Sequence, residues 1–229
     1  EQKAKGVIAA SAGNHAQGVA LSGRTLGIAA TIVMPETTPG IKVQAVRNFG
    51  ANVVLHGGSF DEARQHMEDM IESTGCVYVP PFDDPHVIAG QGTVALEILR
   101  QRTEALDAVF VPVGGGGLIA GIAAYIKSLW PEIKVIGVEP EDAPTLHAAM
   151  HAGQPVRLNQ VGIFADGVAV AEIGKEPFRI AHQCVDEVVL VNTDEICAAI
   201  KDIFEETRSI AEPAGALAVA GVKKYVATK

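Results

Sequence analysis

The sequence predicts an α/β protein with two lobes of parallel sheet flanked by helices. Short apolar runs of strand length alternate along the chain with stretches of helical apolar spacing, an order typical of parallel sheets with helical crossovers. Two of the apolar runs lead into glycine-containing turns that open helices. The 229 residues, 48% of them hydrophobic, are enough to bury the cores of two such lobes.

A small domain of residues 1–87 is expected first. Its first helix has Gly27 in the place of a left-handed cap. Ser59 and Glu62 have the spacing of a capping box for a later helix, which Gly75 ends. Strands are expected at 6–10, 30–34, 52–55 and 76–79, and helices before Gly27, at 41–49 and from 59 to 73, with the apolar stripe of the first helix at Ala16, Val19, Ala20, Gly23 and Leu26.

A large domain of residues 88–229 is expected to follow, entered through a helix at 86–101. Its predicted strands span 108–113, 134–138 and 187–191, and its predicted helices span 145–151, 194–208 and a last segment from about 214, within the usual ±2–4 residues at each boundary. The last helix carries an apolar stripe that we interpret as core, formed by Ala214, Leu217, Ala218, Gly221, Val222 and Tyr225.

Four consecutive glycines, Gly114 to Gly117, lie between a predicted strand and a predicted helix. Because glycine has no Cβ, the backbone amides of such a loop can converge on one anion, and the helix N-terminus behind them adds partial positive charge. Glycine-rich turns also occur merely to bring a helix close to a sheet, but four in a row cost backbone entropy that packing alone rarely requires. The loop is therefore predicted to hold a phosphate.

A second helix start, at residues 11–18, follows the first predicted strand. Its small residues leave backbone amides accessible, and Ser11, Asn14 and His15 add side-chain donors beside them. The segment is therefore predicted to hold a carboxylate. The alternative is an Asn or Ser helix cap with a solvent-facing histidine.

A nicotinamide-binding domain is a rival interpretation from a different class. Gly115, Gly117 and Ala120 satisfy the dinucleotide fingerprint, and Glu139 ends the next predicted strand, about 20 residues on. This rival predicts that Glu139 pairs with ribose hydroxyls, and it gives no role to Asn14 or His15.

Composition and charge indicate which partners and which cellular location to expect. A net charge of −9 without a basic run argues against nucleic acid as a partner. No apolar stretch approaches the length of a membrane span, and no charged-then-apolar leader opens the chain. We therefore expect a cytoplasmic location and no membrane partner. The cysteines Cys76, Cys184 and Cys197 are odd in number and scattered, which predicts reduced core residues.

Six stretches of the chain, in this order, resemble the threonine dehydratases of the tryptophan synthase β-like group of pyridoxal 5′-phosphate enzymes. The resemblance covers nearly all of the chain and implies the fold type II architecture, with a large lobe that is incomplete at both chain ends. The matching stretches lie at 11–18, 80–85 with 88–93, 111–118, 137–140, 164–169 and 212–216.

The resemblance also implies roles for individual residues. The glycine loop would bind the cofactor phosphate, Asn14 would contact the 3′ oxygen of the pyridine ring, and Glu212 would approach that ring. Asp166 would line the mouth of the active site. The cofactor-binding set is Asn14, Gly114, Gly115, Gly116, Gly117, Leu118 and Glu212, and the substrate-binding set is Ser11, Ala12, Gly13, His15 and Asp166. From the residues alone, Asp166 is nearly as typical of a turn and Glu212 of a helix start.

No lysine of this chain stands in the Ser-Phe-Lys context that such enzymes use for the Schiff base. The resemblance places that lysine upstream of Glu1, so no catalytic residue is assigned here and this polypeptide alone is expected to be inactive. Lys42 is interpreted as a solvated charge.

A cation site is a further implication of the resemblance. In some relatives the glutamate at a Glu-Pro strand end binds a cation together with a backbone carbonyl four residues on and an acid six residues on. Here these positions are Glu139, Ala143 and Thr145. Because the acid is replaced by threonine, K⁺ or Na⁺ is favoured over a divalent ion.

The predicted activity is pyridoxal-phosphate-dependent dehydration and deamination of L-threonine to 2-oxobutanoate and ammonia, the first step toward isoleucine. Serine dehydratase or serine racemase, acting on L-serine, is the alternative within the same fold. A nicotinamide-binding domain and a structural fragment that binds anions weakly remain alternatives from other classes. A homo-oligomer is expected for the full-length protein.

Overall fold

The computed structural model describes residues 2–102 and 104–228, which fall into two compact units, Glu1–Pro81 and Phe82–Lys229. Each unit contains a parallel sheet flanked by helices, as the sequence predicts. The division between the units, at 81/82, lies close to the expected domain boundary at 87/88. The assignment of residues 1–87 and 88–229 to two domains stays a prediction.

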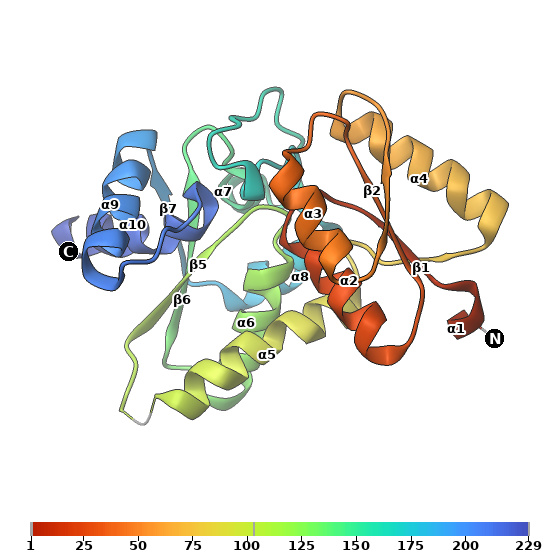
Figure 1. Ribbon diagram of the computed structural model, residues 1–229. Helices are drawn as coiled ribbons and strands as arrows, with labels where there is room; N and C mark the ends of the chain where they lie inside the picture. The colour runs from red at the N-terminus through yellow and green to blue at the C-terminus, as the bar shows by residue number, and fades with distance from the viewer. Residues whose placement is uncertain (1, 103, 229) are drawn as a thin grey trace. The chain divides into compact units, whose positions relative to one another are not determined.

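The first unit has a four-stranded parallel sheet in the order β3-β2-β1-β4. Alternate residues of β1 face opposite sides, as in any strand: Ala9 packs with one cluster, and Ile8 and Ala10 pack with the other. Figure 1 shows α2 and α3 on one side of the strands and α4 on the other. The elements are α1 Gln2–Lys5, β1 Val7–Ala10, α2 Asn14–Leu26, β2 Ala30–Met34, α3 Gly40–Asn48, β3 Asn52–Leu55, α4 Phe60–Thr74 and β4 Val77–Tyr78.

The predicted helix signals of this unit are confirmed. Gly27 ends α2 with φ 63°, and Gly75 ends α4 with φ 67°, both in the left-handed region that glycine tolerates. Ser59 accepts a hydrogen bond from the Glu62 amide and completes the capping box. One position of the predicted α2 stripe was wrong: Leu26 is 59% exposed.

The second unit has a three-stranded parallel sheet in the order β5-β6-β7. One side packs against α5, α6, α7 and α8, and the other against α9 and α10. In Figure 1, α5 and α6 run side by side, while α9 and α10 lie beside β7. The elements are α5 Pro85–Gln101, β5 Ala108–Pro112, α6 Gly117–Leu129, β6 Lys134–Pro140, α7 Thr145–Ala152, the 3₁₀ turn η1 Asp166–Val168, α8 Lys175–Cys184, β7 Glu187–Val191, α9 Thr193–Thr207 and α10 Pro213–Thr228.

Two expectations about the core were wrong in this unit. In α10, Val222 is 38% exposed, and Ala216 and Ala220 are buried in place of it. Cys197 is exposed on α9, although all three cysteines are free, as expected. Within the described residues, no helix combines the length and apolar character needed to cross a bilayer.

Candidate functional site

The glycine loop connects β5 to α6 and leaves backbone donors without acceptors. Gly116 is the N-cap of α6 with φ 86°, and the first amide bonded back to the cap is that of Ala120. Among the hydrogen bonds between described residues, none uses an amide of Gly115, Gly116, Gly117 or Leu118 as donor. Because buried donors are rarely left unpaired, these amides fit the phosphate that the sequence predicts.

Packing accounts for the absence of side chains in the loop. A Cβ at Gly114 would lie 2.9 Å from Val168 Cα, and one at Gly116 would lie 2.8 Å from Ile173 Cδ1. A Cβ at Gly115 would overlap the Phe82 ring, and one at Gly117 would lie 2.9 Å from Phe82 Cβ. Packing therefore requires all four glycines, contrary to the expectation from the sequence, and the phosphate assignment depends on the unpaired amides instead.

The segment Phe82, Asp83 and Asp84 organises the surroundings of the loop. Phe82 packs on the loop backbone, as the glycine contacts show. Asp83 accepts hydrogen bonds from the amides of Lys175 and Glu176 at the start of α8, and Asp84 caps α5. Three consecutive side chains therefore connect the loop to two helices.

Hydrogen bonds also hold the carbonyl oxygens of the loop. The Thr145 hydroxyl lies 2.8 Å from the Gly114 oxygen, and the Gly174 amide donates to the Gly115 oxygen at 3.1 Å. No phosphate-binding role was predicted for Thr145 or Phe82, because only the folded chain brings them to the loop.

Glu139 is fully buried at the end of β6 and caps α7. Its Oε1 accepts from the Leu146 amide at 2.7 Å and lies 3.0 Å from the Thr145 hydroxyl, and its Oε2 accepts from the His147 amide at 2.9 Å. A carboxylate held in this way cannot reach a ribose, so the nicotinamide alternative is not favoured. Burial raises the pKa of Glu139 to about 7, and the amide and hydroxyl hydrogen bonds oppose that rise only in part.

The raised pKa of Glu139 predicts a loss of stability as pH increases. The folded state binds its proton more tightly than the unfolded state, whose pKa is 4.5, so stability falls between pH 4.5 and about 7. The loss is roughly 1–3 kcal/mol. Urea unfolding of the full-length protein at pH 5 and pH 8 measures it, with Glu139→Gln as the non-titrating reference. An equal pH response of the two proteins would contradict this assignment.

The predicted carboxylate site lies at the start of α2, in the first unit. Gly13 occupies the N-cap without a side-chain cap, and Ser11 Oγ accepts a hydrogen bond from the Gly13 amide at 3.2 Å. The alternative of an Asn or Ser cap with a solvent-facing histidine was wrong, because Asn14 lies inside the helix and His15 is partly buried.

The ring of His15 offers an acceptor nitrogen to a ligand, not the side-chain donor that was expected. Its Nε2 lies 3.0 Å from the Val79 carbonyl oxygen, which can only accept, so Nε2 carries a hydrogen and is already engaged. Burial lowers the pKa of His15, although the Val79 hydrogen bond opposes this, and the neutral ring leaves Nδ1 as an acceptor. Any contact between His15 and a carboxylate is therefore expected through its backbone amide.

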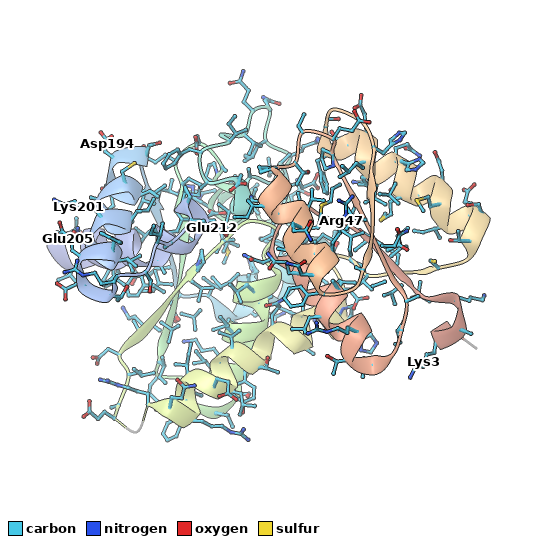
Figure 2. The ribbon with its side chains drawn as sticks, viewed as in Figure 1. Lys3, Arg47, Asp194, Lys201, Glu205 and Glu212 are labelled. Atoms are coloured by element: carbon cyan, nitrogen blue, oxygen red, sulfur yellow. The ribbon has the colours of Figure 1, made fainter. Side chains whose placement is uncertain are left out.

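Asp166 and Glu212 belong to neighbouring segments of the second unit. Asp166 begins η1, whose Val168 packs against Gly114. A Cβ at Gly167 would lie 3.4 Å from Glu212 Oε1, so η1 also contacts the start of α10, where Figure 2 labels Glu212. Within the second unit, η1 therefore contacts both the glycine loop and the start of α10, while the meeting of Asp166 and Glu212 with the loop and with Ser11 to His15 stays a prediction.

A pocket of about 330 Å³ in the second unit has no glycine-loop residue in its lining, which consists of His147, Met150, His151, His182, Val185, Asp186, Glu187 and Val188. Within the described residues, no cluster of three or more His, Cys, Asp or Glu side chains is arranged to hold a metal ion. We assign this pocket no function.

Comparison with known proteins identifies relatives along the whole chain. A family model described as "Pyridoxal-phosphate dependent enzyme" matches residues 1–229. The chain is 62% identical over 226 residues to L-threonine dehydratase biosynthetic IlvA of Pasteurella multocida, covering 99% of this chain and 44% of that protein. It is also 62% identical over 229 residues to the mitochondrial threonine dehydratase of Saccharomyces cerevisiae, covering 99% and 40%. The chain therefore spans less than half the length of these relatives.

Solved structures show the same similarity. The processed form of threonine deaminase isoform 2 from Solanum lycopersicum aligns with a TM-score of 0.96 and 52% identity, over 99% of this chain and 66% of that one. The threonine deaminase of T.th. aligns with a TM-score of 0.94 and 40% identity, over 100% and 75%. Maize serine racemase aligns with a TM-score of 0.91 and 34% identity, over 96% and 66%.

Proposed function

The chain belongs to the pyridoxal-phosphate dependent enzyme family, and on this premise we propose that the protein containing it converts L-threonine to 2-oxobutanoate and ammonia. In the net reaction the substrate loses its α-proton and β-hydroxyl as water, and water later replaces the amino group. The bound cofactor supplies the conjugated ring that takes up the electron pair left by the α-proton.

The structural observation that supports this proposal is the set of unpaired backbone amides in the glycine loop. Amides at a helix N-terminus suit a phosphate dianion, because the donors converge and the helix dipole favours negative charge. In this proposal the chain anchors the cofactor. Gly114 to Gly117 and Leu118 hold its phosphate, while Asn14 and Glu212 contact its pyridine ring.

The start of α2 is proposed to hold the substrate carboxylate. Ser11, Ala12, Gly13 and His15 provide its backbone amides and the Ser11 hydroxyl, and Asp166 lines the entrance. Fixing the carboxylate orients the bond from Cα to hydrogen, which is how a binding group lowers the barrier to proton loss. We propose that the lysine that takes the α-proton belongs to the full-length protein.

The proposal extends to the biological role, the assembly, the location and a bound cation. The name of the P. multocida relative supports a biosynthetic role, and we extend this to the first step toward isoleucine. A homo-oligomer and a cytoplasmic location stay predictions, and the yeast relative is named mitochondrial. K⁺ or Na⁺ at Glu139 and Ala143 also stays a prediction, against which the two amide donors at the Glu139 carboxylate weigh.

The test is an assay of the purified full-length protein with added pyridoxal 5′-phosphate. We expect 2-oxobutanoate to be released from L-threonine more efficiently than pyruvate from L-serine, with both activities lost when the cofactor is removed. A protein that racemises L-serine without releasing a 2-oxo acid from L-threonine would overturn the proposal in favour of the racemase alternative.

A further inference from the structure

We propose that Thr145 is a positioning residue for the phosphate: its hydroxyl fixes the peptide plane between Gly114 and Gly115, and so aims the Gly115 amide. This inference rests on the proposed function, because it presupposes that the glycine loop binds the cofactor phosphate. Thr145 itself makes no contact with the cofactor in this proposal.

A peptide between two glycines has unusual rotational freedom. Between two glycines no side chain opposes rotation of the peptide plane, so the plane can turn over at small cost. In a trans peptide the carbonyl oxygen and the amide hydrogen point in opposite directions. Whatever holds the oxygen of Gly114 therefore also decides where the N–H of Gly115 points.

Thr145 is well placed to hold that oxygen. It is fully buried, and its Oγ1 lies 2.8 Å from the Gly114 oxygen. The same hydroxyl lies 3.0 Å from Glu139 Oε1, and Glu139 in turn binds the amides of Leu146 and His147. The hydroxyl has a single hydrogen, which the shorter distance assigns to the Gly114 oxygen, and a protonated Glu139 can donate its own hydrogen to Oγ1. The hydroxyl is thus held at the first turn of α7 by buried hydrogen bonds.

The next peptide of the loop is held in the same way. The Gly174 amide donates to the Gly115 oxygen at 3.1 Å, which orients the Gly116 amide. Two successive peptides are therefore held by their oxygens, and their N–H groups have no acceptor among the described residues. This arrangement is expected where the amides serve a ligand.

The experiment compares two probes, pyridoxal 5′-phosphate and pyridoxal, on the cofactor-free full-length protein. Thr145→Val removes the hydroxyl at nearly constant volume. We expect the dissociation constant for pyridoxal 5′-phosphate to increase by roughly 3- to 10-fold, the effect of one hydrogen bond, while that for pyridoxal changes by less than about 2-fold. Thr145→Ser, which keeps the hydroxyl, should restore phosphate-specific binding.

Thr25→Val is the matched control, because its hydroxyl also donates to a backbone carbonyl, that of Leu21, but on an exposed face of α2. It should leave both dissociation constants unchanged. Thr145→Ala gives the same comparison should the valine variant not fold. Equal changes for the two probes, or none, would overturn the inference, whereas a wild-type protein that binds both probes equally would contradict the proposed function itself.

Discussion

Gly115→Ala is expected to weaken the binding of pyridoxal 5′-phosphate by the full-length protein by more than about 100-fold, because the new Cβ would overlap the Phe82 ring. The loop or the phenylalanine must then move, and the amides of Gly115 and Gly116 lose their common direction. Each lost bond to a charged phosphate is worth about 1.5–3 kcal/mol, so two together give the stated factor. A titration of cofactor-free protein measures the effect.

Gly40→Ala serves as the control for this prediction. An added Cβ at Gly40, at the start of α3, meets no atom within 4 Å, so affinity should stay unchanged. Removal of the ring at position 82 should also relieve the overlap, because the three close atoms all belong to the ring, and the double variant Gly115→Ala with Phe82→Ala should regain part of the affinity. Full binding by the single variant would show that the loop does not hold the phosphate.

Gly121→Val is expected to cost the protein about 4 kcal/mol of stability or more, through overpacking between α5 and α6. The first added carbon alone would overlap the Ile88 oxygen and lie 2.6 Å from the Gly92 nitrogen. These are backbone atoms of α5, which no rotamer change can move aside, so the two helices must separate. Urea unfolding of the full-length protein measures the loss.

Gly90→Val provides the matched comparison on the partner helix. Gly90 is exposed, and a Cβ there meets nothing within 4 Å. Because valine is a slightly better helix former than glycine, the variant should lie within about 0.5 kcal/mol of wild type. Similar stability of the two valine variants would show that α5 and α6 can separate at little cost.

Strands were predictable because short apolar runs bounded by turn residues reveal them. β2, β3 and β7 have the predicted bounds. Helix α8 was missed because its signals lie elsewhere: Pro177 occupies its first turn, and the side chain that caps it, Asp83, comes from far earlier in the chain. The buried face of α10 was misplaced because alanine at 216, 218 and 220 gives little hydrophobic contrast.

The parts of the candidate site that are contiguous in sequence were predictable, and the contacts between distant positions were not. The glycine loop follows from local sequence, since strand, glycines and helix are contiguous. The role of Thr145 could not be read from sequence, because its contact with Gly114 joins positions that meet only through the packing of α7 against β6. The engagement of His15 with Val79 was hidden for the same reason.

The packing of Phe82 on Gly115 also bears on the history of the loop. A large residue at position 82 can be accepted only after glycine is present at 115, and from then on it removes the route back to any residue with a side chain. Loss of the aromatic ring would have to come first. A contact between two uncharged positions thus sets the order in which substitutions could occur, and it preserves the glycine even in a lineage that no longer needs the phosphate.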